Sequence, residues 1–328
     1  GARFLTLYGI DIVLLIASMM VAATPILLAA LGEMIAEKSG VLNLGVEGMM
    51  IMGAIAGFAA AVQTGSPVTG FAAAAVAGAV MAFLFAVLTQ ILLSNQVATG
   101  LALTLFGLGL SALLGQGYQG ITPPPTPKLF SGPLAELPVV GPLLFRHLAD
   151  IPVLGPILFG HDWVVYLSIA LVIAVHVFLK YSRAGLILRA VGESHDAAHA
   201  LGYRVIRVRI AALMFGGALA GLGGAYLSLV RVPQWTEGMT AGAGWIALAI
   251  VVFASWRAGR VLLGAYLFGG ITVLQLRLQA AEIAIPVQVL SMAPYLITIA
   301  VLVAISSQRN RAALQAPASL GKSFHASI

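Results

Sequence analysis

Apolar residues fill most of the chain in long runs that short polar breaks separate. A helix needs about 20 mostly apolar residues to cross a bilayer, and runs such as FAAAAVAGAVMAFLFAVL (71–88) reach that length without strand-like alternation. The pattern predicts an all-α polytopic membrane protein with about nine transmembrane helices. The predicted spans are 10–31, 46–63, 68–93, 97–117, 162–179, 208–230, 239–256, 260–276 and 287–306.

Composition excludes the other fold classes. Charged residues make up 9% of the 328 residues, the apolar set makes up 60%, and the mean hydropathy is +1.03. An ordinary soluble domain carries about 25% charged residues, so a soluble globular protein is excluded. A disordered chain needs low hydrophobicity and is excluded too. The chain has no cysteine, which removes thiol nucleophiles and disulfides, and we expect no metal site.

The distribution of basic residues predicts the orientation. The long connection 118–161 and the basic loop 180–209 lie on opposite sides of the predicted membrane. If 180–209 is cytoplasmic, 12 of the 17 Lys and Arg residues are cytoplasmic and 5 are outside. The positive-inside rule then predicts an outside N-terminus and a cytoplasmic C-terminus. Residues 1–306 form one transmembrane domain in this interpretation, and 307–328 form a cytoplasmic tail.

Two further patterns concern packing and the outer loop. Gly53 with Gly57, and Gly217 with Gly221, form GxxxG pairs that let helix backbones approach closely. We expect these pairs to pack helices within the chain, with a subunit interface as the alternative. The outer loop holds two similar segments, 137–147 and 151–161, each too short to span. We expect both to lie along the outer face.

Few polar residues lie near the predicted spans, and these are candidates for a solute pathway. The stretch 31–50 contains Asn43 and Glu47 and forms either a charged turn or a break within the membrane, as in many transporters. Asn95, Gln96 and Thr99 enter the fourth span. Amides in a bundle interior either bind a polar solute or join helices, and the sequence leaves both roles open.

The loop 181–210 contains a predicted short helix over about 194–201. Glu193, Ser194 and Asp196 suit its N-terminus, and Gly202 suits its end. Small residues at Ala197, Ala198 and Ala200 give it a narrow face that fits a groove on another protein. The chain contains no catalytic constellation. Its Gly-Lys-Ser at 321–323 lacks the phosphate-loop glycine, because that position is Ala316.

Several motifs resemble those of a known family. Asp196-Ala197-Ala198 followed by Gly202 resembles the EAA loop of ABC importer permeases, with Asp in place of the usual Glu. SRAGLILRAVGES (182–194) and GGALAGLGGAY (216–226) are similar to permeases of the branched-chain amino acid, ribose and nucleoside group. EKSGVLNLGVEGMMIMGA (37–54) and SNQVATGLALTLFGLGLS (94–111) resemble its nucleoside or simple-sugar branch.

The resemblance implies a permease subunit of a bacterial ABC importer in the inner membrane. It implies four kinds of partner: ABC ATPase subunits, a second and different permease, an outside solute-binding lipoprotein and the bilayer. ATP and Mg would bind the ATPase subunits, with no cofactor and no nucleic acid on this chain. Residues Glu193, Asp196, Ala197, Ala198 and Gly202 would form the coupling helix, and 31–54 with 94–104 would line the pathway.

A proton-coupled secondary carrier of a small polar solute is the alternative function. Such a carrier places ionisable residues deep in its spans and has two matching halves. Asp11, Glu47 and His176 lie toward the ends of predicted spans rather than deep inside them, and no matching halves are visible. A structural membrane scaffold is a third possibility that the glycine-rich spans leave open.

Overall fold

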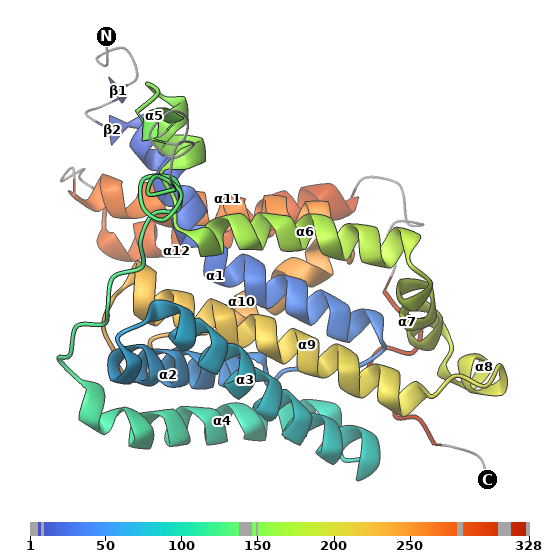
Figure 1. The fold of residues 1–328 in the computed structure, drawn as a ribbon. Helices are drawn as coiled ribbons and strands as arrows, with labels where there is room; N and C mark the ends of the chain where they lie inside the picture. The colour runs from blue at the N-terminus through green and yellow to red at the C-terminus, as the bar shows by residue number, and fades with distance from the viewer. Residues whose placement is uncertain are drawn as a thin grey trace. The chain divides into compact units, whose positions relative to one another are not determined.

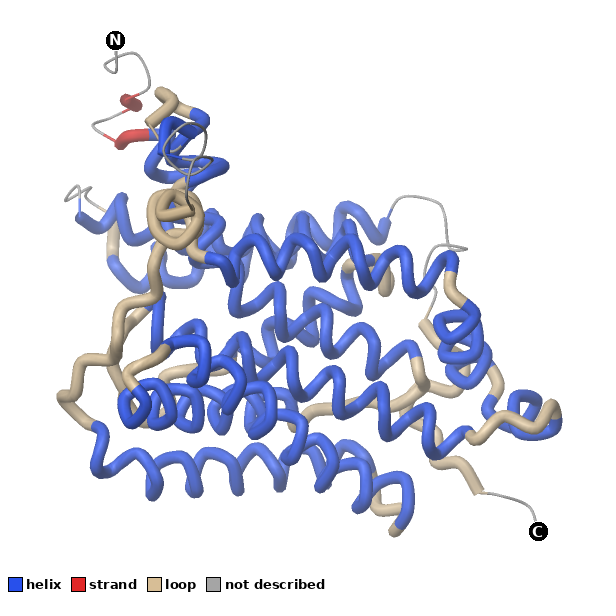
Figure 2. The backbone as a smooth tube through the Cα atoms, in the orientation of Figure 1, coloured by secondary structure: helices blue, strands red, loops and turns tan. Residues whose placement is uncertain are grey.

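The computed structural model describes residues 6–7, 10–137, 146–148, 150–280, 285–307 and 316–325. The regular secondary structure of the described residues is helical (Figures 1 and 2), apart from one short antiparallel pair of strands near the N-terminus. The strands are β1 (Thr6–Leu7) and β2 (Ile10–Asp11). The helices are α1 (Ile12–Lys38), α2 (Val46–Thr64), α3 (Pro67–Ala86), α4 (Gln96–Gly115), α5 (Arg146–Leu148), α6 (Trp163–Tyr181), α7 (Arg183–Glu193), α8 (His195–Ala200), α9 (Val205–Tyr226), α10 (Ala243–Phe253), α11 (Ala258–Ala280) and α12 (Val287–Ser307).

Seven helices of the described part are long and apolar enough to cross a membrane. They are α1, α2, α3, α4, α6, α9 and α11, with π-helical turns extending α3 to Ile91 and α9 to Arg231. The predicted helical membrane class is confirmed, whereas the predicted count of nine is not. The seventh predicted span, 239–256, contains a helix of only 11 residues, and α12 also lies outside the set of seven.

Contacts divide the chain into two compact units. One comprises 1–24, 126–170 and 263–307, and the other comprises 25–125, 171–262 and 308–328. This division does not test the predicted boundary at 306 between the transmembrane domain and the tail, which stays a prediction. In the larger unit, α2, α3 and α9 pack together through glycines. A methyl group on Gly53 would overlap the backbone of Gly221, and one on Gly78 would overlap Gly217. The expected close packing of helices within the chain is confirmed.

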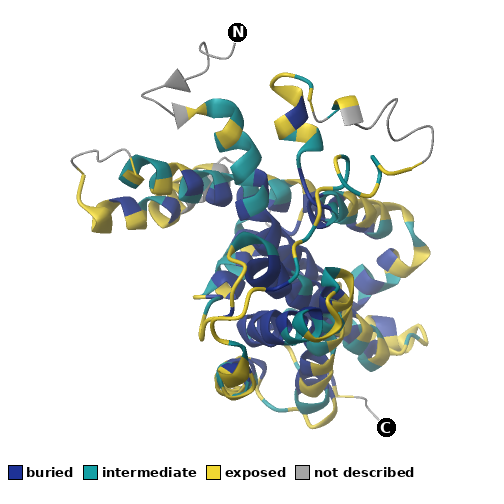
Figure 3. Ribbon diagram, turned by 60° about the vertical axis from the view of Figure 1, so that its left-hand side comes forward, coloured by how far each residue is buried: buried dark blue, intermediate teal, exposed yellow. Residues whose placement is uncertain are grey.

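Local sequence explains where these helices end. Gly65 ends α2 with a φ of 70°, a left-handed conformation that favours glycine. Pro67 then starts α3. Proline is tolerated there because the N–H groups in the first turn of a helix have no acceptor within the helix. The buried core, dark blue in Figure 3, contains large side chains such as Phe58, Phe71 and Phe85.

Large apolar side chains also cover the outside of the long helices. Leu105 on α4 is 71% exposed, and Val76 on α3 and Ile173 on α6 are 63% and 61% exposed. Soluble proteins seldom expose apolar patches of this extent. Lipid contact explains them, because the hydrocarbon core of a bilayer is the solvent that such side chains prefer.

The smaller unit contains the described residues of the long connection from 126 to 161. Lys128 and Asp162 form an isolated antiparallel bridge, and Phe130 packs edge-on against Phe159 and Tyr166. Of the two similar segments, 151–161 includes a π-helical turn at Gly155–Phe159. Most of 137–147 lies outside the described residues.

Candidate functional site

The predicted short helix is present as α8. Ser194 caps it by accepting a hydrogen bond from the Ala197 N–H at 3.3 Å. Gly202 follows it with a φ of 89°, as expected for a residue that turns the chain back. Sequence reasoning missed α7, the 11-residue helix just before it. Its buried positions, Gly185, Leu188, Val191 and Gly192, repeat at helical spacing and were the available signal.

The face of α8 that is free for a partner differs from the predicted one. Ala198 is only 2% exposed and packs with Val191, Val205 and Phe324. Ala198 therefore faces the chain itself, and its assignment to the docking face is corrected. Asp196, Ala197 and Ala200 are exposed, as is Glu193 at the end of α7.

Helix α7 contacts the end of α1 directly. A methyl group on Gly192 would overlap the carbonyl of Lys38, and one on Gly185 would overlap the carbonyl of Phe178. Such close approach leaves little room for α7 to slide independently of α1. The segment carrying α8 is therefore mechanically joined to a membrane-crossing helix.

Arg209 on α9 joins four parts of the chain at one point. Its side chain is fully buried. It donates to the carbonyl of Ser39 at 3.1 Å, to the Gln90 side-chain carbonyl at 3.2 Å and to the carbonyl of Lys322 at 3.1 Å. Its remaining nitrogen lies 3.2 Å from Nδ1 of His195. A buried guanidinium needs such partners, since an unpaired charge there is strongly destabilising.

The proton position on His195 follows from this contact. Arginine can only donate, so Nδ1 must accept and the proton must sit on Nε2. Nε2 faces Asp196 Oδ1 at 3.5 Å. Burial and the neighbouring Arg209 charge lower the pKa of His195 below its ordinary value, while Asp196 opposes that shift. His195 is therefore neutral near pH 7, and its contact with Asp196 is not an ion pair there.

The C-terminal segment 316–325 holds α7 and α8 in place (Figure 1). The Ser319 N–H donates to the carbonyl of Gly192 at 2.9 Å, and the Gly321 N–H donates to the carbonyl of Gly40 at 3.1 Å. Phe324 is 5% exposed and packs edge-on against His195 and His199. The segment thus bridges the end of α1, the end of α7 and one side of α8.

The stretch after α1 is a buried non-helical segment rather than an exposed charged turn. Residues 41–45 connect α1 to α2, and Asn43 is 1% exposed. Its side-chain oxygen accepts from the Gly45 N–H at 3.0 Å, which stabilises the turn into α2. Gln96 on α4 accepts from the Leu42 N–H at 2.9 Å, while its buried Nε2 has no hydrogen-bond partner among the residues that the structure describes. The structure therefore brings two predicted pathway residues to one buried segment.

Glu47 joins the start of α2 to the start of α10. Its carboxylate accepts from the Thr240 hydroxyl at 2.6 Å and from the N–H groups of Gly242 and Gly244 at 2.9 and 2.7 Å. A carboxylate at a helix N-terminus satisfies free N–H groups and complements the helix dipole. Helix α10 is too short to span, at about 17 Å for its 11 residues. Its Trp245 is 42% exposed and donates to the carbonyl of Leu44.

Two further glutamates on α1 are buried. Glu33 accepts from the Asn43 N–H at 3.2 Å, and Glu37 accepts from the Trp256 indole. Trp256 and Ser255 adopt left-handed φ values of 53° and 52° in the turn between α10 and α11. Residues other than glycine seldom adopt this conformation, so surrounding contacts must hold the turn.

The other predicted pathway residues have local partners. Asn95 is exposed and caps α4 by accepting from the Ala98 N–H at 2.9 Å. Thr99 pairs with the Ser94 hydroxyl at 2.8 Å. Sequence reasoning missed Arg209, Gln90 and Thr240 as site residues. The only signal was polar side chains inside apolar runs, which in membrane helices mark functional positions.

Known proteins resemble this chain over most of its length. Residues 15–306 match the family described as the permease component of branched-chain amino acid transport systems. A Haloferax volcanii protein named as a glucose ABC transporter permease is 40% identical, covering 93% of this chain and 95% of its own. A guanosine ABC transporter permease of Bacillus subtilis is 31% identical, with coverages of 87% and 90%. A nucleoside ABC transporter permease of Lactococcus lactis is 30% identical, with coverages of 88% and 91%. No solved structure matches.

Membrane-crossing helices, a buried non-helical break at 41–45 and a short helix outside the spans define a multi-pass transport protein. The chain belongs to the permease component family of branched-chain amino acid transport systems. It is a permease subunit of an ABC transporter, a transport subunit rather than an enzyme. The secondary-carrier alternative has no support from these relatives.

Proposed function

We propose that this chain imports a nucleoside across the inner membrane, with ATP hydrolysed by partner subunits. ABC ATPase subunits would bind ATP and Mg, a second and different permease would complete the membrane part, and a lipoprotein outside would deliver the solute. The N-terminus would lie outside and the C-terminus in the cytoplasm. The 12 to 5 excess of Lys and Arg supports that orientation.

The observation that carries the proposal is the attachment of α8 to the membrane helices. Arg209 and the segment 316–325 tie α8 to the end of α1 and to α9. Asp196, Ala197 and Ala200 remain exposed for contact with an ATPase subunit. A displacement of α8 would then be transmitted to α1 and α9. The close contact of Gly192 with the backbone of Lys38 leaves little room for independent movement. In this role, Glu193, Asp196, Ala197 and Gly202 form the coupling element, with Ala198 as its internal anchor.

The pathway would pass the break between α1 and α2. Asn43 and Gln96 line that break, and the unpaired Gln96 Nε2 is a donor for a polar solute. Unpaired buried donors are rare, which makes this one a candidate for use during transport. Glu47 has three donors already, so it would hold the start of α10 rather than bind solute. Asn95 and Thr99 would shape the start of α4.

A sugar is the second candidate solute, because the 40% identical relative is named for glucose. Uptake by proteoliposomes separates the two candidates. The complete transporter would be reconstituted with its binding protein, and uptake of labelled guanosine and glucose would be compared with and without enclosed ATP. We expect ATP-dependent guanosine uptake. Uptake of glucose alone would select the second candidate, and uptake without ATP would contradict the proposal.

A further inference from the structure

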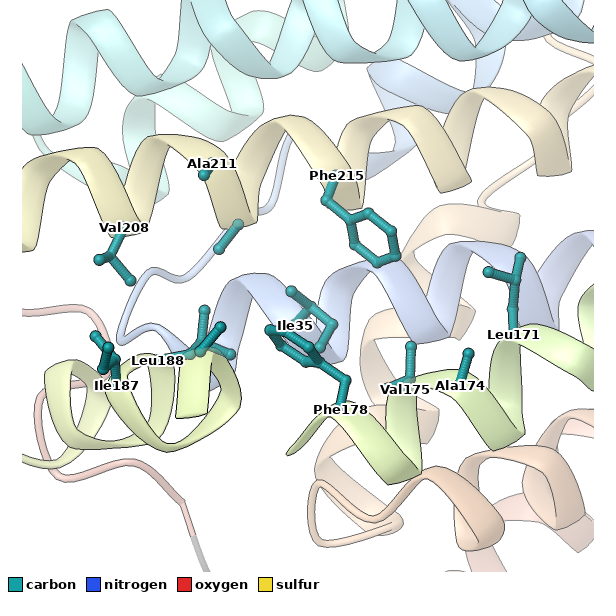
Figure 4. A pocket seen from close by; sticks show the side chains of 12 residues that line it. Ile35, Leu171, Ala174, Val175, Phe178, Ile187, Leu188, Val208, Ala211 and Phe215 are labelled. Carbon is teal, nitrogen blue, oxygen red and sulfur yellow. The ribbon is translucent and has the colours of Figure 1, made fainter. Parts of the chain in front are cut away.

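A large apolar cavity lies between four helices of the larger unit. Its volume is about 540 Å³, within the range of about 300–1,000 Å³ typical of ligand pockets. Figure 4 shows its lining, 12 side chains from α1, α6, α7 and α9, all of them hydrocarbon. Phe178 from α6 and Phe215 from α9 point into it from opposite sides (Figure 4).

The side chains that line the cavity determine which class of ligand it can bind. It offers no polar side chain, so a nucleoside or sugar would lose its hydrogen bonds with water and gain none. Water itself does not stably fill an apolar cavity. Ala174 and Ala211 line it and are exposed, so the cavity opens to the surroundings. In a bilayer, the abundant apolar ligand at such an opening is a lipid acyl chain.

Basic residues lie near the starts of α7 and α9, two of the helices that line the cavity. Three exposed arginines each precede a lining residue by four positions: Arg183 before Ile187, Arg204 before Val208 and Arg207 before Ala211. Residues four apart in a helix lie on the same face, one turn from each other, which places Arg183 beside Ile187 on α7 and Arg207 beside Ala211 on α9, while Arg204 precedes α9 as its N-cap. Side chains lean toward the helix N-terminus, so these guanidinium groups extend beyond the cavity toward the starts of α7 and α9. Residues 180–209 contain six basic and two acidic side chains, which gives this region a net positive charge.

We propose that this cavity binds an anionic phospholipid. One acyl chain fills the space between α1, α6, α7 and α9, and the phosphate lies against Arg183, Arg204 and Arg207. Basic pockets between membrane helices bind anionic headgroups, and each Lys or Arg near the surface contributes about five-fold in affinity (about 1 kcal/mol). The site is separate from the proposed solute pathway, because Asn43 and Gln96 are not among its lining residues.

Native mass spectrometry of the purified transporter tests the proposal. Phosphatidylglycerol and phosphatidylcholine with identical acyl chains would be added in turn, and the bound fractions compared. We expect the wild type to retain phosphatidylglycerol in preference to phosphatidylcholine. The triple variant R183Q/R204Q/R207Q should reduce that preference at least ten-fold, and the control Arg257→Gln, an exposed arginine away from the cavity, should not.

Substitutions that fill the cavity test separately whether an acyl chain occupies it. Ala174→Phe and Ala211→Phe should each abolish binding of both lipids, because the added rings occupy the cavity. Ala102→Phe, at an exposed position on α4 outside the lining, is the matched control. Equal retention of the two lipids by the wild type would overturn the proposal. So would undiminished binding in both filled variants, or a lipid-free cavity covered by another protein chain.

Discussion

The guanidinium of Arg209 donates to the carbonyl of Ser39 at 3.1 Å, across 170 residues of sequence. This hydrogen bond fixes α9 to the turn that follows α1. The same guanidinium contacts His195 at the start of α8, so one buried cation holds the proposed coupling helix and two membrane helices together.

Arg209→Gln should uncouple α8 from the spans. A hydrogen bond to a charged group contributes about 1.5–3 kcal/mol, and Arg209 makes several. We expect the variant to insert in the membrane but to lose most ATP-dependent uptake and to melt at lower temperature. Thermal unfolding and proteoliposome uptake measure both effects. Arg257→Gln, at an exposed position, is the control, and a variant with wild-type uptake would show that Arg209 is dispensable.

Phe324→Ala should release the C-terminal segment. Truncating a buried phenylalanine costs about 3–5 kcal/mol, and Phe324 supplies the aromatic contacts of the segment to α8. We expect residues 316–325 to become sensitive to protease in the purified protein. Lys322→Ala is the matched control, because its backbone carbonyl still accepts from Arg209. Equal protease resistance in the two variants would show that Phe324 does not hold the C-terminal segment 316–325 against α8.

Acidification should weaken the packing of the C-terminal segment 316–325 against His195 on α8. Burial and Arg209 lower the pKa of His195, so folding favours its neutral form. That stabilisation is present above the ordinary histidine pKa of about 6.5 and is lost as the pH falls below it. Lys322 and His325 add positive charge nearby, and only Asp196 favours the protonated form. We expect protease sensitivity of 316–325 to rise between pH 7.5 and 5.5, and this rise to shrink in His195→Gln.

Gly53→Ala should destabilise the bundle. The added methyl group would overlap the backbone of Gly221, where no flexible side chain can move aside. Overpacking of this kind typically costs about 1–3 kcal/mol. Gly109→Ala is the matched control, because nothing lies within 4 Å of a methyl group there. A lower melting temperature for Gly53→Ala alone is expected, and equal melting temperatures would contradict the packing.

The sequence predicted those features that depend on local patterns. Apolar run length predicted the membrane helices, and the Ser194 and Gly202 signals predicted α8 within about one residue at each end. The direction of Ala198 was not predictable, because it depends on Phe324, 126 residues away. The Arg209 contacts to Ser39 and Lys322 are likewise long-range. The place of Glu47 at the start of α10 was not predictable either, because its donors Thr240, Gly242 and Gly244 lie 193, 195 and 197 residues away.

We propose that α8 docks on an ATPase subunit through its exposed face, and cross-linking in the assembled transporter tests this contact most directly. The chain has no cysteine, so a single Ala197→Cys variant can be cross-linked selectively in membranes that contain the whole transporter. Asp150→Cys, at an exposed position in the connection 118–161 that we propose to lie outside, is the control. We expect a covalent adduct of the permease with the ATPase subunit from position 197 and none from position 150. Absence of the adduct from position 197, while the complex still hydrolyses ATP and transports, would contradict it.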